Sequence, residues 1–381
     1  MMAMLCIPAL LYFARSSNTA LLKQRDFLLL PHFTQVLSSR PGGKRLNKGP
    51  ENKSLVENLA TMGVDVVMAR RRQPGVLRKA VTNEIGLAHF LQSKGASRSA
   101  VAGIISRFPR SITRTEAHLE ERWALWRSIF RTDSEIVKIL ERSPESFFRS
   151  SDNANLEKNI LFLGSLGLGS RELHRLLTTA PRTFSNSVEL NRQVVELLQD
   201  LCVSLGGDKP EQFAKAIISK NLYILIRSTT RIKANVAFLR KELHLSDGEL
   251  LSLLHGHGAD VLGLSTEHLK RNLSSVLEKL KSLSCQKSDV KKLIISHAPV
   301  LLVSPNNLNS KLDCLVEGGV HIRQILEKPK ILDFSVENIK TRLAELNEIG
   351  YDFKKNGISI LDSSRKRFEA KLERLTASIE E

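Results

Sequence analysis

Apolar residues recur at positions i, i+4 and i+7 in eight segments of the chain. Leu119, Trp123 and Trp126 form the first of these triplets. The spacing places the three side chains on one face of an α-helix. Successive triplets begin 29 to 42 residues apart, and a helical unit that repeats with such a period is typical of an α-solenoid. The other triplets are Leu156/Ile160/Leu163, Leu190/Val194/Leu197, Ile232/Val236/Leu239, Leu269/Leu273/Val276, Leu308/Leu312/Leu315, Ile339/Leu343/Leu346 and Phe368/Leu372/Leu375.

Proline provides a second repeating mark. Short apolar segments such as Val101–Ile105 precede it and are predicted to be helical. Proline ends such a helix because it has no backbone N–H and its ring clashes with the preceding turn. A short apolar stretch and the next triplet follow, so each unit is predicted to contain a helix, a proline, a connector and a second helix. Two units carry Asn221–Leu225 or Leu254–Asp260 instead of the proline. The prolines are Pro74, Pro109, Pro144, Pro181, Pro299 and Pro329.

The remaining patterns favour an all-α fold. No segment shows the bounded alternation of apolar and polar residues that would indicate a β-sheet. No apolar run reaches the ~20 residues of a membrane-spanning helix. Glycine is predicted to end several helices because it readily adopts the left-handed conformation found there; these glycines are Gly63, Gly95, Gly167 and Gly350. We therefore expect residues 55–376 to form one helical-repeat domain.

The first 50 residues differ from this pattern. They contain seven lysines and arginines but one acidic residue, Asp26, and apolar patches such as Phe27–Leu30 are interleaved with serines. This composition is typical of a mitochondrial transit peptide. A secretory signal is the alternative, but no apolar core lies between an early basic cluster and a small-residue cleavage site. We expect residues 1–50 to be a transit peptide with a disordered junction, and the mature protein to lie in the mitochondrial matrix.

Charge points to a polyanionic partner. The chain carries a formal net charge of +17; the first 50 residues supply 7 − 1 = +6, which leaves 17 − 6 = +11 for the predicted domain. Each predicted triplet helix has a basic residue near its start. These residues alternate with the triplets, so we expect them to project from the core and align into a phosphate-binding basic stripe; an ordinary solvated helix face is the alternative. The basic stripe comprises Arg122, Lys158, Arg192, Lys233, Lys270, Lys311, Lys340 and Lys371.

The sequence carries no recognisable motif for catalysis or metal binding. Gly164–Gly169 is glycine-rich but lacks the G-x-G-x-x-G spacing and the preceding strand of a dinucleotide site. His255 and His257 have no further ligand at useful spacing and are expected to be a loop pair. The cysteines form no C-x-x-C pair, which favours a reducing compartment; they are Cys6, Cys202, Cys285 and Cys314. We expect a protein without catalytic activity, cofactor or metal.

The repeated phrases resemble those of the mTERF family. SRFPRSITRT at 106–115, LERSPESFFRS at 140–150 and LTTAPRTFSNS at 177–187 are the phrases that carry the resemblance, together with MARRRQPGVL at 68–77 and RFEAKLERL at 367–375. The resemblance implies a left-handed superhelix of paired helices that acts as a monomer. It also implies binding to double-stranded mitochondrial DNA in the tRNA-leucine gene, just past the ribosomal RNA genes. Bending, unwinding and base eversion of that DNA are implied, as is a block to the mitochondrial RNA polymerase that terminates transcription.

The resemblance also implies roles for individual residues. Five positions match base-reading arginines of the family's founding member, but one of them holds lysine here. Arginine grips guanine O6 and N7 with two donors, whereas lysine is a point charge, so Lys330 is expected to read its base less strictly. The five positions are Arg149, Arg182, Arg231, Lys330 and Arg367.

Three further positions match residues that stack on everted bases. Arg142 is unchanged from the founding member. Tyr223 stands in place of a phenylalanine and should stack comparably, whereas His268 replaces a tyrosine and offers a smaller face. Without the resemblance, Tyr223 would be assigned to the core and His268 to an exposed helix face. Arg142 and Arg149 would be assigned to surface pairs with Glu141 or Glu145.

Two other functions fit parts of the pattern. Helical repeats of about 35 residues also occur in proteins that read one RNA base per repeat. That alternative predicts a preference for single strands. A protein-scaffolding solenoid is the second alternative, and it predicts no salt-dependent binding to nucleic acid.

Overall fold

The computed structural model describes residues 49–380, with side chains described as far as Ala377. The predicted transit peptide, apart from Gly49 and Pro50, lies outside the described residues. Residues 51–381 form one compact unit. Across the described residues the regular elements are α-helices and short 3₁₀-helices, with no β-strand, which confirms the predicted all-α class.

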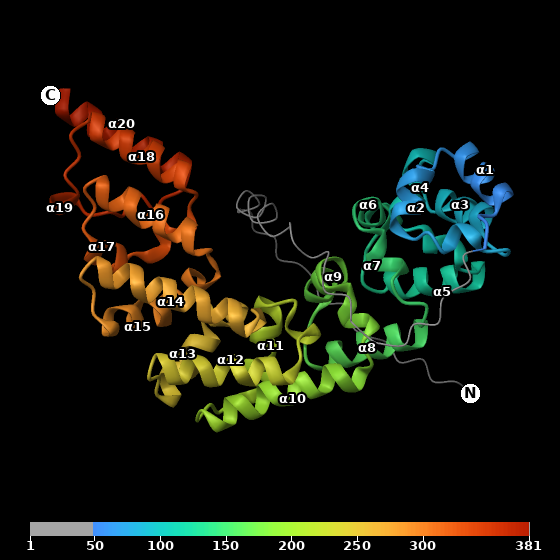
Figure 1. The fold of residues 1–381 in the computed structure, drawn as a ribbon, viewed down its shortest axis with the longest axis horizontal. Helices are drawn as coiled ribbons and strands as arrows, with labels where there is room; N and C mark the ends of the chain where they lie inside the picture. The colour runs from blue at the N-terminus through green and yellow to red at the C-terminus, as the bar shows by residue number, and fades with distance from the viewer. Residues whose placement is uncertain (1–48, 381) are drawn as a thin grey trace, which may run out of the picture. The chain divides into compact units, whose positions relative to one another are not determined.

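Each unit consists of a first helix, a second helix and a connector that leads to the next first helix (Figure 1). The first helices are α1 Lys53–Thr61, α3 Glu84–Ser93, α5 Glu116–Arg127, α8 Asn153–Ser165, α10 Val188–Ser204, α12 Thr229–Glu242, α14 Thr266–Ser282, α16 Pro305–Glu317, α18 Val336–Glu348 and α20 Arg365–Glu380. The second helices are α2 Val66–Arg72, α4 Arg98–Arg107, α6 Asp133–Arg142, α9 Ser170–Thr179, α11 Pro210–Lys220, α13 Asp247–His255, α15 Lys287–Ser296, α17 Ile322–Glu327 and α19 Phe353–Asn356.

The connectors are short helical turns, most of which begin at or beside the prolines identified in the sequence. They are η1 Val76–Arg78, η2 Pro109–Thr113, α7 Pro144–Phe148, η3 Pro181–Ser185, η4 Ile224–Ile226, η5 Gly258–Gly263, η6 Ala298–Leu302 and η7 Pro329–Asp333. The eight predicted triplets lie in α5 and the later first helices. Two first helices, α1 and α3, precede them, so the repeat begins earlier than the triplets indicate.

Side chains and glycines set the ends of the helices. Most first helices begin after a residue whose side chain accepts a backbone N–H that has no partner within the helix. Thr115 accepts from the N–H of His118 at 3.3 Å, and Ser265 accepts from that of His268 at 3.2 Å. The glycines predicted at helix ends adopt φ between 66° and 92°, which favours glycine because it has no Cβ; they are Gly63, Gly95, Gly167 and Gly350.

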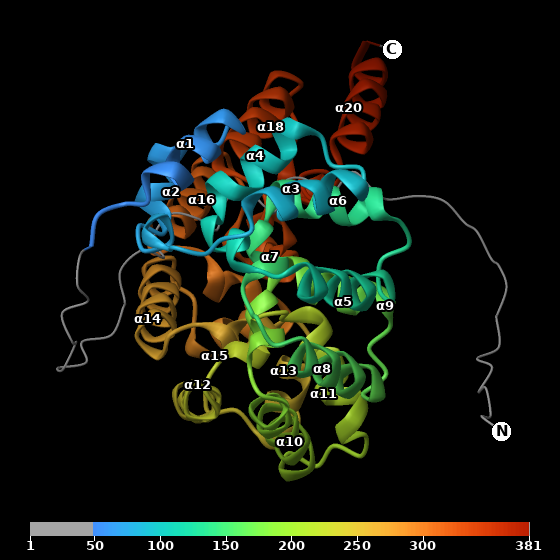
Figure 2. The ribbon, with the colours of Figure 1, turned by 90° about the vertical axis from the view of Figure 1, so that its right-hand side faces the viewer.

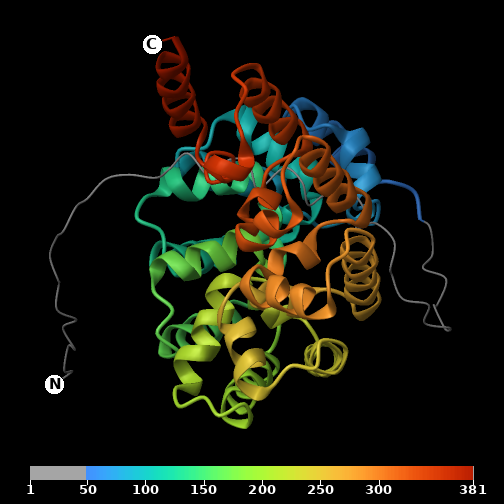
Figure 3. The ribbon, with the colours of Figure 1, turned by 90° about the vertical axis from the view of Figure 1, so that its left-hand side faces the viewer.

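The units pack mainly against their neighbours in the chain. Helix α10 packs between α8 and α12 (Figure 2), and the C-terminal units, orange to red in Figure 3, repeat the arrangement, with α16 between α14 and α18. The connectors also touch one another, in the order α7, η3, η4, η5 and η6. Because each unit buries its apolar face against the next one, the chain is an α-solenoid, as the repeat period predicts.

Most residues of the predicted triplets are buried, but the register in α10 differs from the prediction. Leu190 is 52 % exposed, whereas Asn191, Val195 and Leu198 are buried. The cap of α10 is Ser187, and the buried face begins four residues after the cap in this helix, as it does in the other triplet helices. The predicted triplet of α10 is therefore wrong by one residue, because a polar asparagine occupies the first core position.

A buried polar residue, called an anchor here, stands seven positions after the cap in six first helices. Its side chain donates to backbone carbonyl oxygens of the connector that follows. Arg122 in α5 donates to the carbonyl oxygens of Phe147 and Ser150, both at 2.7 Å, and Asn272 donates to that of Leu301 at 2.8 Å. An unpaired buried polar group costs about 1–3 kcal/mol, so the anchors hold the connectors in place. The anchors are Arg122, Asn159, Asn235, Asn272, Lys311 and Arg342.

Candidate nucleic-acid interface

The residues with an implied base contact lie on one edge of the repeat. This connector edge comprises the end of each second helix, the connector, and the first turn of the next first helix. Arg182 and Lys330 each follow the proline of a connector. Arg231, His268 and Arg367 each occupy the third position of a first helix, and the last two are exposed. Positions that are far apart in the sequence therefore share one structural role.

The third helical position explains the exposure of Leu190. It is the third residue of α10, where other units place Arg231, His268 or Arg367. The backbone N–H at this position donates to the cap, as in Leu190 to Ser187 Oγ at 3.4 Å, so the side chain is directed away from the core. An apolar side chain on the connector edge can contact only what binds there or solvent.

Arg142 and Arg149 lie on the connector edge of the unit formed by α5, α6 and α7, directly before the unit that contains Arg182. Arg142 is the last residue of α6 and is exposed, and Arg149 directly follows α7. Arg149 forms an ion pair with Glu145, one turn earlier. The surface pair considered as an alternative for Arg149 therefore exists. Both side chains remain partly exposed, so such a pair is weak and can exchange for another anion.

The central units bring four of the edge residues together. The connector η3, which holds Arg182, contacts η4, which follows Tyr223. Arg227 directly follows η4 and is half-buried. Burial lowers the pKa of Arg227, and the positive charges of Arg231 and Arg182 lower it further, whereas Tyr223 opposes them. Arg227 is thus close enough to each of the other two arginines to be repelled by it, and an anion at this place would relieve the repulsion.

Tyr223 is 42 % exposed although its neighbours are buried. Leu222 is 7 % exposed and Ile224 is fully buried. The backbone N–H of Tyr223 donates to Oδ1 of Asn221 at 3.1 Å, which fixes the turn before η4. The core assignment that its apolar neighbours suggest is wrong, and the ring is available on the connector edge.

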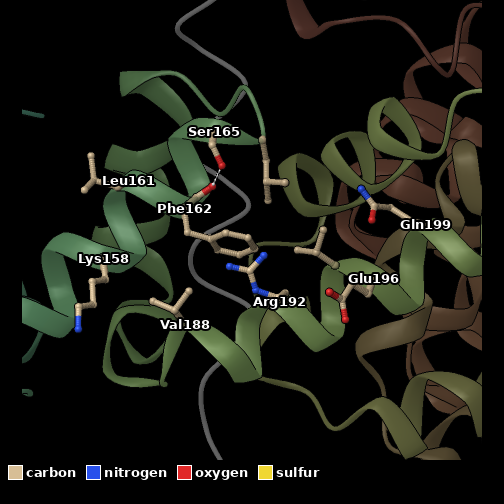
Figure 4. Close-up of a pocket in the computed structure, with 10 residues that line it drawn as sticks. Lys158, Leu161, Phe162, Ser165, Val188, Arg192, Glu196 and Gln199 are labelled. Carbon is tan, nitrogen blue, oxygen red and sulfur yellow. Dashed lines mark hydrogen bonds between the residues drawn. The ribbon is translucent and has the colours of Figure 1, made fainter.

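Six residues of the basic stripe are exposed: Lys158, Arg192, Lys233, Lys270, Lys340 and Lys371. Arg192 lies over the ring of Phe162 in the preceding first helix, 5.1 Å from its centroid (Figure 4). Lys270 takes the same position over Phe238, at 5.9 Å. Lys158 and Arg192 also line a cavity of about 590 Å³ between α8 and α10, together with Leu161 and Val188.

The prediction that Arg122 and Lys311 project from the core is wrong. They are 2 % and 5 % exposed, and Lys311 Nζ donates to the carbonyl oxygen of Leu332 at 2.6 Å. Both are anchors, seven residues after the cap, where the helix faces its connector. Arg192, Lys233, Lys270 and Lys340 lie five residues after the cap instead. Counted from the first triplet residue, Arg122 and Lys311 stand three positions on, whereas Lys233, Lys270 and Lys340 stand one position on. Arg122 and Lys311 cannot contact phosphates without unfolding the connector.

Three arginines of the connector edge were not identified from the sequence. Arg110 follows a connector proline, in the position of Arg182, and Arg114 and Arg227 each stand one residue before the cap of a first helix. The signal was present, because SRFPRSITRT contains both Arg110 and Arg114. Aligning the units on the cap rather than on the triplet reveals these positions.

The burial of His118, at the start of α5, predicts how the stability of the protein depends on pH. His118 is the third residue of α5, and burial lowers its pKa to about 4, with Arg122 and Arg114 adding to the effect and Glu121 opposing it. Between that value and about 6.5, the unfolded chain binds the proton and the native chain does not, so lowering the pH favours unfolding. We expect the free energy of unfolding to fall between pH 7 and pH 5, and to fall less in His118→Gln. Urea titrations at both pH values measure this; equal losses would contradict the assignment.

Within residues 49–380, no group of three His, Cys, Asp or Glu residues could hold a metal ion. His257 lies near His297, with ring centroids 6.5 Å apart. No helix in the described part of the chain combines the length and apolar character needed to span a membrane.

The sequence profile of the mTERF family matches residues 56–369. Transcription termination factor 1, mitochondrial, of Rattus norvegicus is 51 % identical over 345 residues, which cover 90 % of this chain and 92 % of that protein. Its counterpart of Homo sapiens is 51 % identical over 326 residues, or 86 % of this chain and 82 % of that protein. Transcription termination factor 2, mitochondrial, of Homo sapiens is 31 % identical over 365 residues, or 95 % and 94 %. These relatives confirm the expected mitochondrial location. With the profile spanning most of the solenoid, the chain belongs to the mTERF family.

Proposed function

We propose that this chain binds double-stranded mitochondrial DNA along its connector edge, in a sequence-specific way and without catalysis. The observation that carries the proposal is the set of three arginines at the contact between η3 and η4: Arg182 in η3, Arg227 directly after η4 and Arg231 in the first turn of α12, with the exposed Tyr223 directly before η4. The first helices also begin on this edge, so the positive ends of their dipoles favour phosphate. Termination of mitochondrial transcription is the function named for the relatives at 51 % identity, and it is the function of this chain.

The base-reading positions and the basic stripe are suited to different contacts with DNA. Arginines at the connector and at the third helical position can reach base edges with a two-pronged fork, which discriminates by about 1–3 kcal/mol per base pair. The exposed cations of the basic stripe supply attraction to phosphate without sequence preference. We place Arg149, Arg182, Arg231 and Arg367 in the first group, and Lys330 beside them as a base contact of lower specificity. A mitochondrial polymerase that meets the bound protein would then be blocked.

We further propose that Tyr223 and Arg142 stack on bases taken out of the duplex. Eversion costs a few kcal/mol per base, and an aromatic or guanidinium face returns about 1–3 kcal/mol. The 42 % exposure of Tyr223 leaves part of its ring free for such a contact. His268 is exposed at the third position of α14 and offers a smaller ring, so its contribution should be the least.

Salt dependence tests the proposal. If six to ten phosphates are contacted, log K should fall with log salt at a slope of about −5 to −9. The eight first helices from α5 to α20, at ~10 Å each, extend about 80 Å, which at ~3.4 Å per base pair gives a footprint of roughly 20 to 25 pairs. The measurement is fluorescence anisotropy of a labelled duplex across salt concentrations, with footprinting on the mitochondrial genome. A slope near zero would favour the scaffold, and tighter binding to single strands would favour RNA.

The same titration reports on eversion. A fluorescent base analogue at the central pairs should brighten when the native protein binds. In the Arg142→Ala/Tyr223→Ala double variant it should stay dim, while anisotropy still shows complex formation at low salt. Full termination without any change in fluorescence would show that the block requires no everted base.

A further inference from the structure

The N-terminal end of the connector edge contains a cationic cavity. Its volume is about 500 Å³, and it lies between η1, η2 and the segment after α7. Its polar lining is Gln73, Thr113 and Ser151, and no aspartate or glutamate lines it. Four cations line it: Lys79, Arg110, Arg114 and Arg149. A concave surface of one sign, with hydroxyl and amide groups beside it, favours a phosphate-bearing ligand.

Arg114 is held in this cavity at an energetic cost. One of its Nη atoms donates to the carbonyl oxygen of Phe148 at 2.9 Å, but its buried Nε has no hydrogen-bond partner. Burial lowers its pKa, and Arg110 lowers it further. The backbone N–H of Arg110 donates to Gln73 Oε1 at 2.7 Å, so the loop that carries both arginines is fixed. An anion between the two guanidinium groups would reduce their repulsion.

The structure assigns this cavity, by our inference, to consecutive backbone phosphates of the bound nucleic acid. The inference rests on the proposed function, which it extends by two units toward the N-terminus. Arg149 fits both roles because it lines the cavity and also matches a base-reading position. Its ion pair with Glu145 must then open, and a backbone phosphate is the competing anion.

The central cluster contains a related arrangement. Arg227 stands one residue before a cap, as Arg114 does, and its Nε is also buried without a hydrogen-bond partner. Arg110 and Arg114 belong to one connector segment, whereas Arg182 and Arg227 come from two successive connector segments, at η3 and η4, which contact each other. Two places that are distant in the sequence therefore each combine an arginine before a cap with a second arginine, which favours the same kind of anionic ligand at both.

The test removes two cations of the cavity that are exposed, Lys79 and Arg110, in the full chain. Lys79→Gln/Arg110→Gln should reduce the salt slope by about 2, at about one unit per lost phosphate contact, and weaken cognate and scrambled duplexes alike. Lys281→Gln/Lys287→Gln is the matched control, because these exposed lysines lie where α14 ends and α15 begins, at the other edge of the repeat. The control should leave the slope unchanged.

Neutral methylphosphonate linkages locate the contact. In the native protein, linkages at two or three neighbouring positions at one end of the footprint should weaken binding; in the cavity variant the same linkages should have no effect. Unchanged slope and unchanged interference in the variant, with normal binding by the native protein, overturn the inference and leave the proposed function standing. Failure of the native protein to bind duplex overturns the proposed function itself. Saturation of the cavity by millimolar inorganic phosphate with no competition by duplex would assign it to a free phosphate and also overturn the inference.

Discussion

Arg122→Met is expected to lower the free energy of unfolding by about 3 to 5 kcal/mol, the largest effect of any single substitution proposed for this protein. Besides the two connector carbonyls, Arg122 donates to Asn153 Oδ1 at 2.7 Å and to the carbonyl oxygen of Asp152 at 3.2 Å. Burial lowers its pKa to about 10, so it stays charged at neutral pH and donates every bond. Methionine fills a similar volume but leaves these acceptors unpaired. Urea unfolding followed by circular dichroism measures the loss.

Two other anchor substitutions serve as controls. Arg122→Lys keeps the charge and one donor, and Lys311 shows that lysine can serve as an anchor, so the loss should be smaller than for methionine. Lys311→Met removes a single bond to a carbonyl oxygen and should cost about 1–3 kcal/mol. A loss below about 1 kcal/mol in Arg122→Met would show that water replaces the guanidinium and that the anchors do not hold the connectors.

Arg182→Ala is expected to reduce the preference for the cognate duplex over a scrambled one by about 1–3 kcal/mol, or roughly 5- to 150-fold. Arg182 is exposed on η3, and its positive charge acts on Arg227, which follows the adjoining connector η4. Removal of a base-reading fork should affect the cognate complex more than the non-specific one. Competition binding with both duplexes at one fixed salt concentration measures the ratio.

Arg171→Ala provides the matched control for Arg182→Ala. Arg171 is an exposed arginine in the same unit, in the first turn of α9, at the edge opposite the connectors. It should change neither affinity nor preference. Equal losses on cognate and scrambled duplexes in Arg182→Ala would show that Arg182 contacts phosphate only.

Apolar spacing predicted the solenoid correctly because each unit buries one apolar helix face against its neighbour. It failed in α10, where Leu190 and Asn191 are adjacent and the more hydrophobic residue occupies the exposed position. The cap Ser187, not hydrophobicity, sets the helical phase there. The triplet spacing does not mark α3, because Lys94 stands at the third position after Leu87 and Leu91. In α1, Leu55, Leu59 and Met62 do follow the spacing, although the predicted series begins at Leu119.

The candidate interface was less predictable than the fold. Arg122 and Lys311 look like surface cations in the sequence because their burial depends on carbonyl acceptors about 20 to 30 residues further along the chain. Lys371 also lies seven residues after Ser364, the residue before its helix, yet it is exposed, and no further connector follows α20 among the described residues. The exposure of Tyr223 depends on the turn before η4, and the apolar residues around it give no sign of this turn in the sequence.

Hydrogen bonds along the connectors have a mechanical consequence. Arg114 reaches the carbonyl oxygen of Phe148, Asn186 reaches that of Leu225, and Asn221 reaches that of Ala259, so successive connectors are tied directly to one another. Away from this edge, units are joined by exposed ion pairs such as Lys291 with Glu249, which contribute little. The connector edge should therefore resist stretching more than the opposite edge does. If the solenoid flexes to follow a bent ligand, we expect the distances between neighbouring recognition residues to change little, while the spacing of the units changes at the opposite edge.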